Sequence, residues 1–305
     1  MNKKAVVIGI SAAAIIIVAL IFWGIVSKYA RGTGIPGAST GSRAQKTMTA
    51  AEEDAAIRKA EDLLAVSADS PKAEEAYLIL GSVYENRREF EKAKDAYQKL
   101  VEKFPASNNV QKAQEAIGNT NVKMLFSSEP TPYTTIYAVQ KGDNLTKIAR
   151  KLNTTTELVM KVNGLKSPAL QIGRKLRVPK VKFSIAVDKS QNILTLKADG
   201  DIFKTYEVST GKNNSTPVGT FKIINKIVDP PWYRKNAKMV PSGDPNNCLG
   251  SRWMGISKPS YGIHGTIDPG SIGKSVTEGC VRMRNPDAEE LYAIVPEGTE
   301  VIIAD

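Results

Sequence analysis

The segment from His264 to Arg284 reads HGTIDPGSIGKSVTEGCVRMR and concentrates the reactive side chains of this 305-residue chain. His264 is the only histidine in the chain, and Cys280 is one of two cysteines. Cysteine attacks carbon as the thiolate, so a nucleophilic cysteine needs a base or a positive charge nearby to lower its pKa. Histidine is the side chain that titrates closest to neutral pH. The segment therefore holds a candidate nucleophile and a candidate base.

The immediate neighbours of Cys280 extend this interpretation. A strand holding Cys280 would point Arg282 to the same face, because side chains alternate along a strand. Gly279 leaves room for close approach to a substrate, and backbone amides at such a position can stabilise an oxyanion. A lone cysteine and histidine are nevertheless more often structural, and a free cysteine commonly behaves as a small buried apolar residue. The pair alone leaves both interpretations open.

The flanking motifs favour catalysis. Residues 261–266 read YGIHGT, and residues 277–285 read TEGCVRMRN. These motifs resemble the signature of the YkuD-type L,D-transpeptidases, in which H-G-T precedes a short insert and then [S/T]-x-G-C-[I/V]-R-[M/L]. The matching positions after the insert are Thr277, Gly279, Cys280, Val281, Arg282 and Met283. Many relatives carry a histidine directly before the Gly-Cys pair, where this chain has Glu278.

The resemblance implies a role for each matching residue. Cys280 would be the acylated nucleophile, and His264 would be its general base. The carbonyl of Gly265 would orient the imidazole, the amides of Gly279 and Cys280 would form an oxyanion hole, and Arg282 would add positive potential. Further substrate contacts are expected from Trp232, Tyr261, Thr266, Thr277 and Asn285.

Residues 182–305 are expected to form a β-rich catalytic domain. Alternating apolar residues predict strands around Phe183, Ile185 and Val187, and around Ile202, Tyr206 and Val208, with turns at 198–200 and 210–212. Residues 216–221 and 246–255 resemble further segments of the same family. Cys248 stands where the family usually has proline, so we expect it to be incidental to catalysis. Residues 229–233 would begin a flap over Cys280, or Trp232 would instead pack on the core.

Residues 134–180 are expected to form a wall-binding module. Residues 137–149 follow Y-x-V-x-x-G-D-x-L-x-x-I-A, and residues 170–179 follow L-x-x-G-x-x-L-x-V-P. This pattern resembles a LysM domain, which implies a βααβ fold that binds glycans containing N-acetylglucosamine. The residues that would contact the sugar are Gly142, Asp143, Asn144, Gln171 and Ile172.

Residues 48–126 are expected to form a small helical unit. Thr49 and Glu52 make a capping-box pattern, and Pro71 suits the first position of a helix. Residues 74–107 resemble one tetratricopeptide repeat, and residues 110–125 would form a capping helix. One repeat cannot bury its own faces, so it must pack on neighbouring helices or on a partner. A protein-binding role and a spacer or oligomer contact remain open. Residues 121–134 are expected to be a linker.

Residues 5–26 form an apolar run interrupted only by Ser11. As a helix, the run would reach about 33 Å, enough to cross a bilayer core. A cleaved signal peptide is the alternative, although residues 27–31 make a poor cleavage site. We therefore expect residues 1–26 to be a membrane anchor and residues 27–47 a flexible tether. The body would lie in the periplasm or extracytoplasmic space of a bacterium, where the implied substrate is.

The chain carries 42 Lys and Arg against 31 Asp and Glu, a net charge of +11. This balance favours anionic partners, and the absence of a nucleic-acid-binding module favours peptidoglycan and the membrane over nucleic acid. One histidine and two distant cysteines cannot make a metal cluster, so no cofactor is expected. The predicted fold class is multidomain α+β: a transmembrane helix, a small α-helical hairpin unit, a βααβ LysM module and a β-rich catalytic domain.

The expected function is peptidoglycan L,D-transpeptidation through a thioester on Cys280, which gives 3→3 cross-links. Two enzymatic alternatives remain: an L,D-carboxypeptidase, with water as acceptor, and transfer to another amine such as a protein lysine. The non-enzymatic alternative is a wall-binding scaffold that uses only LysM and the helical unit.

Overall fold

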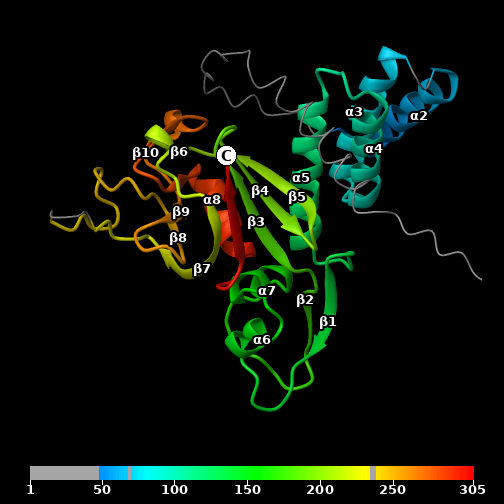
Figure 1. Cartoon of the computed structure of the whole chain (residues 1–305). Coiled ribbons are helices and arrows are strands. Elements are labelled where there is room, and N and C mark those ends of the chain that lie inside the picture. Colours follow the sequence, from blue (N-terminus) through cyan, green and yellow to red (C-terminus); the bar gives the residue numbers. More distant parts are fainter. Residues whose placement is uncertain (1–47, 68–69, 234–237) are drawn as a thin grey trace, which may run out of the picture. The chain divides into compact units, whose positions relative to one another are not determined.

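The computed structural model describes residues 48–67, 70–233 and 238–305 (Figure 1). The predicted anchor and tether, residues 1–47, lie outside this range. Within the range, no helix combines the length and the apolar character needed to cross a membrane. The described residues form helices first, then a small βααβ module, then a β-rich domain, in the predicted order.

The helical unit consists of four helices. They are α2 (Ala50–Ser67), α3 (Pro71–Asn86), α4 (Phe90–Lys103) and α5 (Val110–Phe126). The predicted capping box forms, because Glu52 N donates to Thr49 Oγ1 at 3.3 Å and Thr49 N donates to Glu52 Oε2 at 2.7 Å. Gly81 lies directly against the ring of Tyr97, so its lack of a side chain lets α3 and α4 pack closely.

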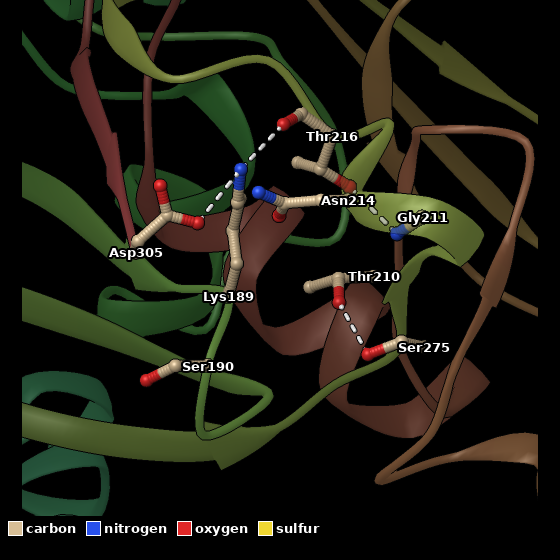
Figure 2. A pocket seen from close by; sticks show the side chains of 8 residues that line it. All are labelled: Lys189, Ser190, Thr210, Gly211, Asn214, Thr216, Ser275 and Asp305. Atoms are coloured by element: carbon tan, nitrogen blue, oxygen red, sulfur yellow. Dashed lines mark hydrogen bonds and ion pairs between the residues drawn. The ribbon is translucent and has the colours of Figure 1, made fainter.

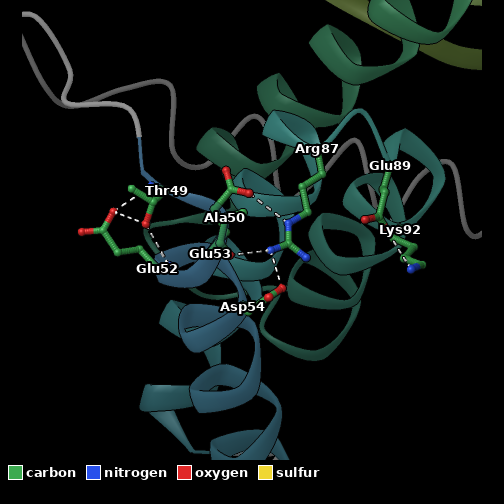
Figure 3. A network of polar contacts seen from close by, with 8 residues as sticks. All are labelled: Thr49, Ala50, Glu52, Glu53, Asp54, Arg87, Glu89 and Lys92. Atoms are coloured by element: carbon green, nitrogen blue, oxygen red, sulfur yellow. Dashed lines mark hydrogen bonds and ion pairs between the residues drawn. The ribbon is translucent and has the colours of Figure 1, made fainter.

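Arg87 ties the end of α3 to the start of α2 (Figure 3). Its Nε donates to Glu53 Oε2 at 3.0 Å, and its Nη2 donates to Asp54 Oδ1 at 2.6 Å and to the Ala50 carbonyl at 3.2 Å. These contacts fit the expectation that a single repeat packs on a neighbouring helix.

The predicted linker over residues 121–134 is wrong in its first part, because α5 continues to Phe126. Asn121 is buried, its Nδ2 donates to the Phe203 carbonyl at 2.7 Å, and its Oδ1 accepts from the Tyr133 hydroxyl at 2.7 Å. Figure 1 shows α5 beside β5 (Asp201–Glu207), to which Phe203 belongs. The polar side chain of Asn121 is therefore a buried anchor of α5 and not part of a linker.

The predicted LysM module has the expected βααβ order. Its elements are β1 (Thr134–Ala138), α6 (Leu145–Lys151), α7 (Thr156–Val162) and β2 (Lys175–Pro179). The strands β1 and β2 are antiparallel, with Ala138 opposite Lys175. The segment that leaves β1 and the segment that enters β2 therefore lie at the same end of the pair, as a groove between them requires.

The β-rich domain is built on an eight-stranded sheet in the order β11-β9-β8-β7-β12-β3-β4-β5. Besides β5, its strands are β3 (Phe183–Asp188), β4 (Ile193–Ala198), β7 (Gly219–Val228), β8 (Arg252–Ile256), β9 (Gly262–His264), β11 (Val281–Arg282) and β12 (Glu300–Ala304). The smaller elements are β6 (Thr210–Gly211), η1 (Lys212–Asn214), η2 (Pro269–Ser271), β10 (Ser275–Thr277) and α8 (Asn285–Ile294). β6 and β10 pair in a separate two-stranded sheet.

The alternation predicted for β3 is confirmed, but that for β5 is confirmed only in part. Tyr206 is buried, whereas Ile202 is 56% exposed and Phe203 is buried in its place. The pairing of β4 with β5 shifts register between Leu196 and Lys197. On one side of such a bulge, the residues that face the core and those that face solvent are exchanged. The alternation of apolar residues in the sequence does not reveal the bulge.

Candidate active site

The sheet brings His264 and Cys280 together from opposite ends of the insert. His264 ends β9, which lies between β8 and β11, and it stands opposite Trp253 on β8 and Arg282 on β11. Cys280 immediately precedes β11, whose Val281 pairs with Ile263. Strand spacing and rise place the Cα atoms of His264 and Cys280 on a diagonal of about 8 Å, so their side chains can meet.

The imidazole of His264 is held in one orientation. Its Nδ1 lies 2.6 Å from the Gly265 carbonyl, as the resemblance implied. A carbonyl can only accept a hydrogen bond, so Nδ1 carries the proton and Nε2 keeps its lone pair. Burial lowers the pKa of His264 to about 4, and the positive charge of Arg282 adds to the effect. At neutral pH the ring is therefore a neutral base.

The thiol of Cys280 is protonated in the free protein. Burial raises its pKa above the ordinary value, although the N–H of Gly262 and the charge of Arg282 act in the opposite direction. Desolvation therefore outweighs the charge of Arg282 in setting the pKa of Cys280. The Sγ atom donates to the Ser260 carbonyl at 3.7 Å. Because the thiol is protonated and the imidazole is neutral, a base must remove the thiol proton as the sulfur attacks.

The turn before Cys280 is fixed by Thr277. Its buried hydroxyl donates to the Cys280 carbonyl at 2.6 Å and accepts from Gly279 N at 3.1 Å. The Gly279 amide thus bonds within the turn, and the oxyanion hole expected from the Gly279 and Cys280 amides stays a prediction. Thr277 supports the turn, and its expected substrate contact also stays a prediction.

Gly279 is required by conformation and by space. Its φ of +126° is one that only glycine adopts easily. A Cβ atom there would lie 2.6 Å from Cε1 of Tyr261 and 3.0 Å from the Ser215 carbonyl oxygen. The glycine that precedes the nucleophile therefore serves to place Cys280, with the half-buried ring of Tyr261 beside it.

Two further residues with expected substrate contacts support the loop after His264. Asn285 Oδ1 accepts from the backbone N–H groups of Ser251 at 3.1 Å and Thr266 at 2.9 Å. Thr266 is buried, and its hydroxyl accepts from Asp268 N at 3.0 Å. Their polar atoms hold this loop, and the expected substrate contacts of both residues stay predictions.

Arg282 lies where the resemblance placed it. It influences the pKa of both His264 and Cys280. Its Nη1 donates to Ser271 Oγ at 3.0 Å, and its backbone pairs with Ser209. The neighbouring Glu278 instead has a side chain 85% exposed that pairs with Lys212 at 2.7 Å. The position that holds a second histidine in many relatives thus faces solvent here.

A groove of about 330 Å³ adjoins Cys280 through Ser260. Tyr261 lines this groove, in keeping with its predicted substrate contact. Trp232 pairs through its backbone with Val240, by bonds of 2.8 and 2.9 Å. The position of its indole over Cys280 stays a prediction.

A second, polar hollow of about 310 Å³ was not foreseen from the sequence (Figure 2). The buried ammonium of Lys189 donates to the Thr216 carbonyl at 2.9 Å and pairs with Asp305 at 3.1 Å. Thr216 Oγ1 accepts from Gly211 N at 2.7 Å. A Cβ atom at Gly211 would lie 2.9 Å from the Gly279 Cα. These residues support the Gly279 turn from the side of β6.

Cys248 and Cys280 are not joined in a disulfide, and each is partly buried. Cys248 lies near enough to contribute to the raised pKa of Cys280. It therefore belongs to the surroundings of the nucleophile, which the sequence did not indicate.

In the LysM module, two of the predicted sugar contacts build the loop. Asp143 Oδ2 accepts from the Tyr137 hydroxyl and from Gln140 N, both at 2.8 Å, and these bonds hold the Asp143 pKa below its ordinary value. Asn144 Oδ1 caps α6 by accepting from Lys147 N at 2.8 Å.

The other three residues predicted to contact the sugar are exposed to solvent. Gly142 adopts a φ of +85°, and Gln171 and Ile172 are exposed, the latter by 71%. Val139 bonds to Gly173 and Arg174, so the two predicted loops adjoin.

Known proteins match the chain in three segments. Family models match residues 182–303 as an L,D-transpeptidase catalytic domain, residues 137–179 as a LysM domain and residues 75–107 as a tetratricopeptide repeat. The Bacillus subtilis protein named "Putative L,D-transpeptidase YkuD" is 37% identical over 174 residues, which are 97% of that protein and 55% of this chain. The chain belongs to the YkuD-type L,D-transpeptidase family.

Solved L,D-transpeptidases also resemble this YkuD-type chain. The catalytic domain of the Enterococcus faecium L,D-transpeptidase is 22% identical, with 40% of this chain and 97% of that chain covered and a TM-score of 0.35. An L,D-transpeptidase from Mycobacterium smegmatis is 18% identical, with 44% of this chain and 65% of that chain covered and a TM-score of 0.35.

Proposed function

We propose that the chain is a peptidoglycan L,D-transpeptidase that forms 3→3 cross-links through a thioester on Cys280. The observation that carries the proposal is the pairing of β11 with β9, which sets the Cys280 thiol one strand away from a buried imidazole whose Nδ1 lies against the Gly265 carbonyl. This arrangement occurs in a chain that belongs to the YkuD-type family and also has a LysM domain.

In the first half-reaction, Cys280 attacks the carbonyl carbon of the third stem residue, at its bond to the D-residue in position four. Nε2 of His264 takes the thiol proton as the carbon–sulfur bond forms. When the tetrahedral intermediate collapses, the carbon–nitrogen bond breaks, and the leaving amine takes the proton from His264. The products are a thioester and a free D-amino acid.

In the second half-reaction, an amine from another stem attacks the thioester carbonyl. His264 accepts the proton of the amine, the carbon–sulfur bond breaks, and the sulfur recovers a proton. The new bond is the 3→3 cross-link. Arg282 stays charged throughout and lies close enough to both side chains to stabilise negative charge on sulfur.

The other parts of the chain would bring the enzyme to its substrate. A LysM domain that holds glycan strands raises the local concentration of stem peptides. We place the body outside the cytoplasmic membrane of a bacterium, anchored through residues 5–26, and we assign the helical unit a protein partner. The support for the anchor is the apolar run in the sequence.

The proposal is tested with the purified full chain and disaccharide-tetrapeptides. Tetrapeptide–tripeptide dimers joined 3→3, accompanied by free D-amino acid, are expected. Shortened tripeptides alone would identify an L,D-carboxypeptidase, and no change in the substrate would identify a scaffold. Intact-mass analysis with a carbapenem, which should acylate the thiol, gives a second readout. Cys280→Ala should lose both signals, and Cys248→Ala is the matched control.

The location is tested separately. Membrane fractions of cells that make the full chain should retain it after carbonate washing, and external protease should degrade its body once the outer layers are opened. A chain released by carbonate, or a body protected from protease, would contradict the proposed anchor and its orientation.

A further inference from the structure

The imidazole of His264 has an aromatic neighbour that lies outside the segment from His264 to Arg284. Trp253 on β8 stands opposite His264 on β9. The two rings are stacked, with centroids 5.9 Å apart and planes inclined by 19°. Aromatic rings prefer such an offset arrangement, which leaves the ring edges free for hydrogen bonds.

The indole of Trp253 is itself held in place. Its Nε1 donates to Asn225 Oδ1 at 3.1 Å, and the same oxygen accepts from Gly255 N at 3.2 Å. A Cβ atom at Gly262 would lie 2.7 Å from the indole, and one at Gly255 would lie 3.0 Å from Nε1. Two glycines thus make room for the ring, and one amide fixes its direction.

We propose that Trp253 is a positioning residue for His264. Its indole holds the imidazole in the plane that keeps Nδ1 on the Gly265 carbonyl and Nε2 available to the thiol, and it keeps water off one ring face. Asn225 acts through Trp253 by fixing the indole. The effect of Trp253 on the reaction rate rests on the proposed function, whereas its effect on the state of His264 does not.

The same indole also connects the base to the neighbouring groove. Trp253 lines the groove of about 330 Å³ together with Asn225 and Tyr261. Any group bound in the groove packs against the ring that orients His264. Trp253 is therefore a residue that contacts both the groove and the imidazole.

The covering indole contributes to the neutral state of His264. Burial is the main cause that lowers the pKa of His264 to about 4, and the charged side chain acting on the ring is Arg282 from β11. The carbonyls of Gly265 and Leu249 act in the opposite direction. Removal of the indole admits water, so the pKa of His264 should rise toward the ordinary value of about 6.5.

The test uses the single histidine of the chain. Nitrogen-15 imidazole spectra of the purified full chain report the tautomer and titration of His264 without overlap. In Trp253→Ala, we expect the titration midpoint to rise by at least one pH unit and the Nδ1–H tautomer to become mixed. Carbapenem acylation at pH 7 should slow by about tenfold. Trp253→Phe should restore most of each signal, because it keeps a stacked ring.

Ile302→Ala is the control for general effects, because Ile302 is partly exposed on β12. Its His264 titration should equal that of the parent chain. If Trp253→Ala does not fold, the test uses Asn225→Ala, which removes the hydrogen bond that fixes the indole. This variant should raise the titration midpoint of His264 by a smaller amount. The proposal is overturned if folded Trp253→Ala shows the titration midpoint and the tautomer of the parent chain. If only Asn225→Ala folds, the same result in that variant overturns the proposal.

The two proposals fail separately. A parent chain with the expected tautomer that releases no D-amino acid contradicts the proposed function and leaves the positioning role standing. A chain that forms cross-links, but whose Trp253→Ala variant keeps the parent titration, contradicts the positioning role alone.

Discussion

Polar motif residues hold two segments of the molecule, the turn that carries Cys280 and the loop that begins α6. The two segments differ in how much of their side chains is exposed to a ligand. Thr277 holds the active-site turn through its hydroxyl, and Asn144 caps α6 through its side chain. His264 is then only 3% exposed, whereas Ile172 in the neighbouring LysM loop is 71% exposed. The active site keeps its base from water, whereas the LysM module presents an apolar side chain to water. Changes in the two regions should therefore have separable effects.

The largest difference between the effect on catalysis and the effect on wall binding is expected for Cys280→Ala. It should reduce cross-link formation by about a thousandfold or more, because the proposed thioester forms on the sulfur that this change removes. Binding to purified cell-wall sacculi should not change. Cys248→Ala should keep both activities, as measured by muropeptide chromatography and by sedimentation with sacculi. Loss of wall binding in Cys280→Ala would show that the two regions are not independent.

His264→Asn should reduce carbapenem acylation at pH 7 by about a hundredfold or more, because the thiol then has no base. The rate of this variant should rise as the pH approaches the raised pKa of Cys280, since the thiolate forms without help. The measurement is the acylation rate from pH 6 to pH 10 by intact mass. A rate that stays flat over this range would show that the lost base does not limit the variant.

The buried imidazole should also make stability depend on pH. The folded pKa of His264, about 4, lies below its ordinary value of 6.5, so the unfolded chain binds the proton more tightly. The free energy of unfolding contributed by the neutral ring is fully present above pH 6.5 and falls by about 3 kcal/mol as the pH drops to 4. Urea unfolding should show this fall in the parent and a smaller one in His264→Asn. An equal fall in the parent and in His264→Asn would show that the imidazole of His264 is exposed to water in the folded chain.

The smallest effect is expected in the LysM module. Ile172→Asp should weaken sacculus binding by about tenfold, because it replaces an exposed apolar side chain with a charge. Asn144→Ala should cost about 1 kcal/mol of stability through the lost helix cap and affect binding less. Sedimentation with sacculi and thermal unfolding compare the two variants. If Asn144→Ala weakened binding more than Ile172→Asp, the sugar contacts would be polar.

The motifs allowed the nucleophile, the base and its carbonyl partner to be predicted from sequence, because each lies within a distinctive pattern. They did not reveal that Thr266, Thr277 and Asn285 support the backbone, since a motif shows that a residue is required but not which groups it bonds. The raised pKa of Cys280 depends on burial, which no local pattern records. Trp253 lies eleven positions before His264 and becomes its neighbour only through strand pairing.

The fold followed the sequence wherever periodicity was regular. The capping box at Thr49 and the alternation in β3 were predicted correctly. The exposure of Ile202 was not, because the register shift between β4 and β5 breaks the alternation. Asn121 was included in a linker predicted over residues 121–134, yet two hydrogen bonds allow it to be buried at the end of α5.

The most direct test of the account is to trap the acyl-enzyme. The full chain is mixed with disaccharide-tetrapeptide, quenched in acid within seconds and digested for mass analysis. The account predicts that the peptide containing Cys280 gains the mass of the disaccharide-tripeptide acyl group, and that one D-amino acid is released for each group bound. Cross-linked product without any acyl group on Cys280, or an acyl group on a different residue, would contradict it.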